Sequence, residues 1–479
     1  MKKSIYILIA LLGVNLGLSA QNEVDALRYG QFNSVGTARY TAMGGALGAM
    51  GADLSVMSNN PAGLGVYRSS QLVFSFGQFN NNAQSNFIGN SSTINEFSLK
   101  PTVLGFVVAD VAVSNSDWKF INVGFSYNQL QNFNSRFSVR GTNTESSLLD
   151  YEVQKLNEGI VDEDYSSYYQ ANVFLWDDVN KSYVNDYQDA GGNYNLYQSH
   201  SFSSSGFAGE YNFTVAGNYL DKLYLGGSIG LQQVRYEQVI EHYEEPNNDI
   251  ALIEFSSEDY LYSKGSGINL KLGFLYKASQ ELRLGAAIHT PTIYSFSDEF
   301  HTDVYAYYID GGEVVKGVGK APRGKFNWNY RSPLKIQTSL AYVFGTHGLL
   351  SAEYEFINYK GMLLSSENYF FDEENENIRT FYKNGHNIRL GGEYRLGLVN
   401  LRGGFAYYGS AFDENTVNND AHTLVYSGGA GINLGNAFVD LAYQYTTLSE
   451  KYFMYNYASS MVELDKIRST FLLTLGLKF

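Results

Sequence analysis

Residues 268–277 read INLKLGFLYK, with a large apolar side chain at every second position from Ile268 to Tyr276. Asn269, Lys271 and Gly273 stand between them. Successive side chains of a β-strand point to opposite faces of the sheet. This stretch therefore predicts a strand with one oily face and one polar or small face.

The same alternation recurs along the chain, for example in INVGFSYN at 121–128 and in FLLTLGLKF at 471–479. About fourteen such runs can be counted, and few are shorter than about 10 residues, the length of a tilted strand that crosses a bilayer. The runs lie near 69–79, 97–110, 119–140, 206–219, 222–240, 259–277, 281–299, 326–345, 348–360, 386–396, 398–409, 422–434, 436–448 and 469–479.

The connections between these runs alternate between long and short. The long ones are 80–96, 141–205, 241–258, 300–325, 361–385, 410–421 and 449–468, and short ones separate the remaining runs. Outer-membrane barrels have an even number of strands, short periplasmic turns and long extracellular loops, whereas a soluble β-sandwich has no reason to keep this parity. We therefore predict an all-β fold, a 14-stranded antiparallel transmembrane β-barrel in the outer membrane of a Gram-negative bacterium.

The start of the chain predicts export. Lys2 and Lys3 precede an apolar run from Ile5 to about Leu18, and Ala20 provides a small residue at the cleavage site. We interpret residues 1–20 as a signal peptide, whose removal takes two lysines away and changes the formal charge from −15 to −17. This acidic balance argues against nucleic-acid binding. The absence of cysteine excludes a disulfide scaffold and any cysteine-ligated metal.

The oily face of each strand should lie toward lipid, so the other face lines the lumen. Opposite charges on neighbouring strands can then pair across the lumen wall. Such a lumen charge network is predicted from Glu353, Glu355, Arg389, Glu393, Arg395 and Arg402. We expect it to stiffen the barrel more than to bind substrate. The final residue, Phe479, ends the last amphipathic run and is similar to the signal that the outer-membrane assembly machinery recognises.

Residues 21–68 differ from the rest, because small residues dominate and strand alternation is absent. This composition fits a compact, partly helical plug. A barrel of fourteen strands has a lumen too wide for its own side chains to fill. We therefore predict an N-terminal hatch over 21–68 that plugs the lumen of a barrel formed by 69–479.

Within this segment, GALGAMGADLSVMSNNPAGLG resembles the hatch of the FadL/TodX family of outer-membrane transporters for long-chain fatty acids and hydrophobic compounds. Asn60, Pro61 and Ala62 match the family's hatch motif. The segments 282–300 and 331–362 also resemble family segments, so the resemblance covers the mature chain.

The resemblance implies passive uptake of a hydrophobic small molecule, either a long-chain fatty acid or a similar compound. Extracellular loops would capture it, and a movement of the hatch would release it sideways through a kink in the third strand. The second half of that strand, 128–134, is polar on both faces. This pattern fits a lateral opening, but it equally fits a strand that extends above the membrane.

Alternative functions are a receptor for haemin or another surface ligand, favoured by the aromatic loop 141–205, and a non-specific porin. We predict no enzyme, because no catalytic motif occurs, although His289 is a strand histidine on the lumen side. No cofactor and no metal site is expected. The expected partners are a hydrophobic small-molecule ligand, outer-membrane lipid and the outer-membrane assembly machinery, and we expect a monomer.

Overall fold

A computed structural model describes residues 22–479 except 33–34, 113–116, 160–164, 193 and 457. The predicted signal peptide lies outside the described residues. Within the described part, no helix is long and apolar enough to cross a membrane.

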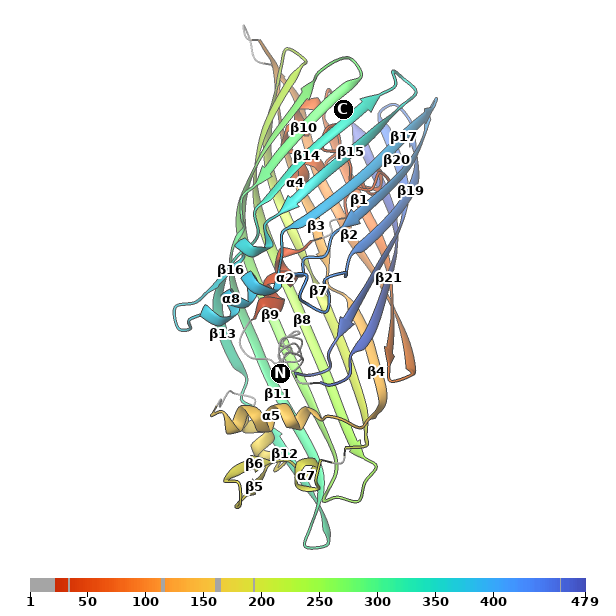
Figure 1. Ribbon diagram of the computed structural model, residues 1–479. Coiled ribbons are helices and arrows are strands. Elements are labelled where there is room, and N and C mark those ends of the chain that lie inside the picture. Colours follow the sequence, from red (N-terminus) through yellow and green to blue (C-terminus); the bar gives the residue numbers. More distant parts are fainter. Residues whose placement is uncertain (1–21, 33–34, 113–116, 160–164, 193, 457) are drawn as a thin grey trace.

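The chain forms a closed antiparallel β-barrel of fourteen strands, which confirms the predicted fold (Figure 1). Each strand pairs with its neighbour in chain order, and β21 closes the barrel by pairing with β1 from Gln71↔Lys478 to Asn86↔Glu463. The strands are β1 (Gln71–Phe87), β2 (Asn90–Ala112), β3 (Trp118–Asn132), β7 (Leu196–Tyr219), β8 (Leu223–Pro246), β9 (Leu252–Lys277), β10 (Leu282–His289), β14 (Lys335–Val343), β15 (Gly348–Ile357), β17 (Gly385–Leu396), β18 (Val399–Tyr408), β19 (Thr423–Asn433), β20 (Ala437–Tyr452) and β21 (Val462–Lys478).

The alternation in the sequence places the side chains as expected. On β9, Leu272 is 63% exposed on the outer face, while the neighbouring Lys271 is 3% exposed and faces the lumen. Apolar side chains cover the outside of the other strands in the same way. This outer belt follows from a lipid solvent, which can accept apolar groups but cannot hydrogen-bond to polar ones.

Several predicted boundaries were wrong. The segment 80–96 is no long loop, because β1 and β2 continue through it to a two-residue turn at Ile88 and Gly89. Both turn residues have positive φ, 45° and 78°, as a tight β-hairpin turn requires. The segment 300–325, which was predicted to be a long loop, is also mostly strand. The alternation of side chains continues there beyond the membrane, although the composition resembles that of a loop.

Short strands lengthen the barrel wall at the end where β1 and β2 turn. β10 gives way to β11 (Ile293–Asp310), which pairs with β9, β12 (Glu313–Lys320) and β13 (Gly324–Arg331). β13 in turn pairs with β16 (Leu363–Ser365), which follows the 3-10 helix η2 (Tyr359–Gly361). The predicted single strands 281–299 and 326–345 are therefore each split in two. The splits fall at Thr290–Thr292 and Ser332–Leu334, segments that carry Pro291 and Pro333, which cannot donate to a ladder.

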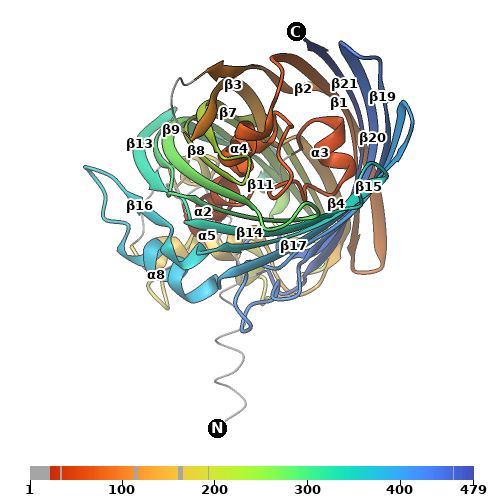
Figure 2. The same ribbon diagram turned by 90° about the horizontal axis from the view of Figure 1, so that it is seen from above.

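The N-terminal segment folds inside the barrel. It contains α2 (Glu23–Gly30), α3 (Ala38–Ala42), α4 (Val56–Asn59) and the 3-10 helix η1 (Pro61–Val66). Figure 2 shows α3 and α4 within the ring of strands. Nearly all of their residues are buried.

The insertion between the third and fourth barrel strands forms a small folded unit rather than an open loop. It contains α5 (Leu148–Asn157), α6 (Tyr165–Gln170), α7 (Asp186–Asp189) and the hairpin β5 (Leu175–Asp177) and β6 (Ser182–Val184). Figure 1 places it at the opposite end of the barrel from the C-terminus. The aromatic side chains of Tyr168, Phe174 and Tyr187 are buried in a core that the unit shares with residues of β9 and β11.

Candidate functional site

The Asn60-Pro61-Ala62 triplet lies on a floor made by two glycines of the barrel wall. Gly226 of β8 and Gly273 of β9 are cross-strand partners. A Cβ atom on Gly226 would lie 2.5 Å from the Pro61 carbonyl carbon, and one on Gly273 would lie 2.2 Å from Asn60 Oδ1. Real Cβ contacts are essentially never that short. Only glycine at both positions lets the hatch backbone reach the wall.

Hydrogen bonds fix the triplet in this position. The Asn60 amide donates to the carbonyl of Gly48 at 2.8 Å and to that of Phe274 at 3.1 Å. From the barrel side, Asn122 of β3 donates to the Leu64 carbonyl at 2.8 Å. Because these groups are buried, their loss would leave polar atoms without partners.

A second pair of glycines receives the other side of the hatch. Gly391 of β17 and Gly404 of β18 are also cross-strand partners. A Cβ atom on Gly391 would lie 2.4 Å from the Met43 carbonyl oxygen, and one on Gly404 would lie 2.1 Å from the Gly44 nitrogen. The hatch therefore packs between two pairs of glycines on the barrel wall.

The charged residues singled out in the sequence lie in two groups. In the first, Arg389 Nη2 donates to Glu355 Oε1 at 2.7 Å, and Arg389 Nη1 also pairs with Glu353. The hatch joins this group, because the Gly48 nitrogen donates to Glu353 Oε2 at 2.9 Å and the Asn59 amide donates to Glu353 Oε1 at 3.2 Å. The Glu353 carboxylate thus connects barrel and hatch.

In the second group, one carboxylate faces three guanidinium groups. Glu393 accepts from Arg402 at 2.9 Å, from Arg395 at 3.0 Å and from the hatch residue Arg39 at 3.1 Å. Arg402 also pairs with Asp440 at 2.5 Å. Arg39 was not anticipated from the sequence, because it belongs to the hatch and reaches the wall only after the chain has folded.

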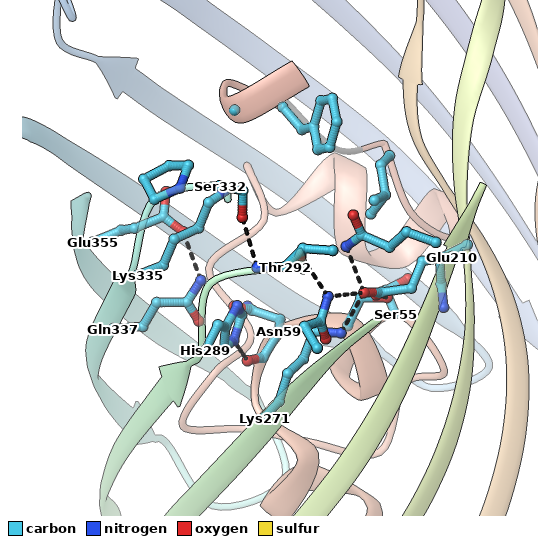
Figure 3. A pocket seen from close by; sticks show the side chains of 18 of the residues that line it. Ser55, Asn59, Glu210, Lys271, His289, Thr292, Ser332, Lys335, Gln337 and Glu355 are labelled. Atoms are coloured by element: carbon cyan, nitrogen blue, oxygen red, sulfur yellow. Dashed lines mark hydrogen bonds and ion pairs between the residues drawn. The ribbon is translucent and has the colours of Figure 1, made fainter. Parts of the chain in front are cut away.

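Between the hatch and the wall lies a polar cavity with a free interior of about 90 Å³, room for a few water molecules (Figure 3). Lys271 and Glu210 form a buried ion pair of 2.5 Å on its wall, and the hatch residue Ser58 donates to Glu210 at 3.0 Å. His289, the tempting strand histidine, contacts the Asn59 carbonyl at 2.6 Å through Nε2. Its ring therefore contacts the hatch backbone.

Above this cavity, α2 inserts an aromatic ring into the barrel. Tyr29 is fully buried and stacks on Phe296 with ring centroids 4.6 Å apart. Phe133, Tyr236 and Trp328 surround it, each with centroids 6.2 Å away. In the described part of the chain the Tyr29 hydroxyl has no hydrogen bond of good geometry. Ring contacts therefore hold Tyr29, while the hydroxyls of Tyr330 and Tyr382 donate to backbone carbonyls of α2 at 2.7 and 2.9 Å.

At the N-terminus of α2, the buried Glu23 meets α8 (Asp372–Phe381), a helix of the loop after β16. The Asn377 amide donates to Glu23 at 3.5 Å. Burial, reinforced by the like charges of Glu374 and Asp25, raises the pKa of Glu23 from 4.5 to about 7. Ionising this carboxyl in the docked state is therefore costly.

A pH dependence of α2 docking follows. A raised pKa means that docking binds a proton, so docking should weaken as pH rises from about 4.5 to about 7 and stay constant above that. The shift corresponds to roughly 3 kcal/mol. Glu23→Gln should remove the dependence, and Glu376→Gln, on the exposed side of α8, should preserve it. A spin label on Gln31→Cys would report mobility, and an equal pH response in both variants would contradict the assignment.

The third strand is broken at the position where the sequence is polar on both faces. β3 ends at Asn132, and β4 (Ser135–Asn143) continues beyond Phe133 and Asn134. β2 pairs with β3 only from Val103↔Asn128 to Ala112↔Phe120. In the described part, β4 pairs with β7 and with neither β1 nor β2. The residues of β2 from 90 to 102 therefore have no strand partner on this side, and we name this unpaired boundary the seam.

Side chains replace the missing ladder across the seam. Asn81 of β1 donates to the Asn134 carbonyl at 2.8 Å, and the hydroxyls of Ser92 and Ser138 are 2.9 Å apart. On the outer face beside the seam, Phe97 is 58% exposed, as expected of a residue in the lipid belt. Along the outer face of the unpaired edge, Ser91, Thr93 and Asn95 are polar, and Phe97 and Leu99 are apolar. Only the part near Phe97 and Leu99 therefore belongs to the apolar belt, where unpaired backbone is tolerated only beside protein or water.

Sequence reasoning missed several residues of this arrangement. The inward glycines Gly226, Gly273, Gly391 and Gly404 were visible as small residues at lumen positions, but nothing local showed that the hatch would contact them. Lys271 and Glu210 stood at lumen positions too, yet their pairing depends on strand register. Phe479 is 76% exposed at the end of β21, and its recognition by the assembly machinery stays a prediction.

The residues also bear on metal binding. Within the described ranges, no group of three or more histidine, aspartate or glutamate side chains could hold a metal ion. In the 141–205 insertion, Tyr168, Phe174 and Tyr187 are buried, whereas Tyr169 and Trp176 are 55% and 50% exposed.

A closed fourteen-stranded barrel with an apolar outer belt and a lumen filled by its own N-terminus is an integral protein of the outer-membrane class. Its fold is that of the FadL/TodX transporters, as the sequence resemblance predicted. A Pseudomonas aeruginosa FadL homologue matches with a TM-score of 0.59 and 12% identity, over 94% of this chain and 100% of that one.

Two further solved structures share the fold. The Pseudomonas putida toluene transporter TodX matches with a TM-score of 0.56 and 12% identity, over 94% of this chain and 100% of that one. The Ralstonia pickettii toluene transporter TbuX matches with a TM-score of 0.50 and 16% identity, over 93% and 99%. No protein-family model and no curated protein sequence matches the chain.

Proposed function

We propose that this protein is an outer-membrane channel for the passive uptake of hydrophobic small molecules, either long-chain fatty acids or similar compounds. The ligand is captured among the extracellular loops and enters the lumen. A shift of the hatch then lets it leave sideways through the seam, which lies between β2 and the wall formed by the break and β4. The seam carries this proposal, because there β2 has lost its strand partner and only side-chain contacts hold the wall together.

The arrangement of the hatch supports the same function over a non-specific porin. Four hatch segments occupy the lumen, and charged groups of the wall bind them. An aqueous pore would need this space for water. A lateral exit avoids the periplasmic end of the lumen, so a hydrophobic ligand can enter the bilayer without crossing water. The toluene transporters that share the fold are consistent with a hydrophobic cargo.

The hatch motif gives a first test of gated uptake. Asn60 connects the hatch to the wall through the Phe274 carbonyl, so Asn60→Ala/Pro61→Ala should change hatch docking. Uptake of radiolabelled oleate would be compared in cells that lack other transporters. Uptake above the empty vector, reduced by the double change at equal surface expression, supports the proposal. Uptake equal to vector removes fatty acids as cargo, and haemin and aromatic hydrocarbons would then be tried.

A disulfide across the seam tests the lateral route directly. The Ser92 and Ser138 hydroxyls lie 2.9 Å apart, so Ser92→Cys/Ser138→Cys should bridge β2 and β4. The chain has no other cysteine to compete. We expect oxidised cells to take up oleate at the vector level and reduced cells to recover most of the wild-type rate. Each single-cysteine variant is the control, and undiminished uptake by the oxidised pair would refute lateral release.

A further inference from the structure

A lysine at the seam has an unusual set of partners. Lys100 of β2 is half-buried and donates to Asn132 Oδ1 at 2.9 Å, to Asn134 Oδ1 at 2.8 Å and to the Gly206 carbonyl at 2.9 Å. An ammonium group has three N–H donors, and each has one acceptor here. All three acceptors are neutral oxygens.

These acceptors belong to the broken part of the wall. Asn132 ends β3, and Asn134 lies in the break itself. Gly206 of β7 faces the break, has a backbone φ of +124°, and accepts a hydrogen bond from the Phe133 nitrogen at 3.3 Å. Lys100 therefore reaches across the seam from β2 and connects it to both strands beyond the gap.

A second cation faces the same place. Arg468 of β21 donates to Asn81 Oδ1 at 2.7 Å and to the Asn132 carbonyl at 3.5 Å. In the described residues, neither Lys100 nor Arg468 forms a salt bridge. The carboxylate of Glu96 makes no salt bridge with them in the described residues, although its charge acts on both from a distance. Two other lumen cations do meet carboxylates, Lys271 with Glu210 and Arg402 with Glu393.

The lumen cavity ends near this position, since its lining includes Asn128, Gln129 and Leu130, which precede the break. A carboxylate brought along this path would meet an ammonium group held only by neutral oxygens. Hydrogen bonds between opposite charges are about twice as strong as neutral ones. The carboxylate can therefore displace Asn132, Asn134 and Gly206 as partner of the amine.

Resting on the lateral release proposed above, we infer that Lys100 closes the seam and selects amphiphiles with an anionic head group. The head group replaces the three oxygens as hydrogen-bond partner of the Lys100 amine. This exchange detaches β2 from the break and opens the exit. An uncharged molecule of the same length has no group to exchange and leaves the closure in place. The head group could arrive from the lumen, on the cargo, or from the bilayer, on an anionic lipid.

The test measures seam closure without transport. Purified, reduced Ser92→Cys/Ser138→Cys protein in phosphatidylcholine vesicles is oxidised, and the rate of disulfide formation reports how often the seam is closed. We expect oleate to slow the reaction several-fold and oleyl alcohol to leave it unchanged. Lys100→Met should abolish the oleate effect, Lys100→Arg should retain it, and the exposed Lys325→Met is the matched control. Vesicles with added phosphatidylglycerol separate a lipid source from cargo.

The outcomes distinguish the two proposals. The role of Lys100 is overturned if Lys100→Met still shows the oleate effect, or if oleyl alcohol has an equal effect. This holds even when cells still take up oleate. Cells that take up no oleate while the Lys100-dependent effect persists overturn the transport function alone. Heat-modified mobility on gels shows whether Lys100→Met has folded, and Lys100→Arg keeps the test decisive where it has not.

Discussion

Gly273→Val is expected to lift the hatch from the wall and to convert a plugged barrel into a conducting one. The new Cβ would lie 2.2 Å from Asn60 Oδ1, 2.6 Å from the Ala62 nitrogen and 2.9 Å from Pro61 Cδ. Two of these three atoms belong to backbone or a proline ring, so rotamer changes cannot relieve the clash. Overpacking of about 1–3 kcal/mol shifts the docked equilibrium by roughly 5- to 150-fold.

Single-channel recording in planar bilayers would measure this effect. The wild type should show little conductance, and Gly273→Val should show frequent open events. Gly227→Val on β8 is the control, because a Cβ there has its nearest neighbour at 3.8 Å, on the lipid-facing Leu272. Equal conductance in the two variants would mean that the glycine floor does not position the hatch.

Arg389→Met should have the largest effect on assembly. Its guanidinium group is 8% exposed and faces the carboxylates of Glu353 and Glu355, which are 1% and 7% exposed. Removing one partner of a buried pair costs about 3–5 kcal/mol, because the remaining charge stays buried. Here two like charges would remain side by side. We expect little folded protein in the outer membrane and a lower urea midpoint in refolding experiments.

Compensating changes separate charge from packing. Adding Glu353→Gln and Glu355→Gln to Arg389→Met removes all three charges and should restore most of the folded yield. Arg395→Met is the surface control, since this guanidinium is 36% exposed and Glu393 keeps Arg39 and Arg402 as partners. A triple variant as defective as Arg389→Met would show that packing of the arginine matters more than its charge.

Two parts of the polar lumen have different functions, one at the hatch and one at the seam. Near the periplasmic end, glycine pairs and the carboxylates of Glu353 and Glu393 hold the hatch. On the side of β2, neutral side chains and Lys100 bridge a wall that has lost its backbone ladder. The first set keeps the barrel closed to water, and the second leaves a place where the wall can part.

The sequence by itself determined the strands and their faces. In residues 268–277, each side chain's position inside or outside follows from its parity along the strand and from the solvent it can tolerate. The number of strands followed from counting such runs, and closure followed from the need to pair every edge in lipid. The charges of Glu353 and Arg389 could be placed in the lumen by the same parity.

Only the tertiary structure decided which segments meet. Asn60 and the Phe274 carbonyl are 214 positions apart in the chain, and their contact depends on how the hatch fits the finished barrel. The sequence predicted one continuous strand over 119–140, because the alternation of side chains does not show whether the neighbouring strand stays close enough to pair. At the break after Asn132, the Gly206 carbonyl accepts from the Phe133 nitrogen, and Lys100 donates to the side chain of Asn132, so residues of two other strands supply the partners there.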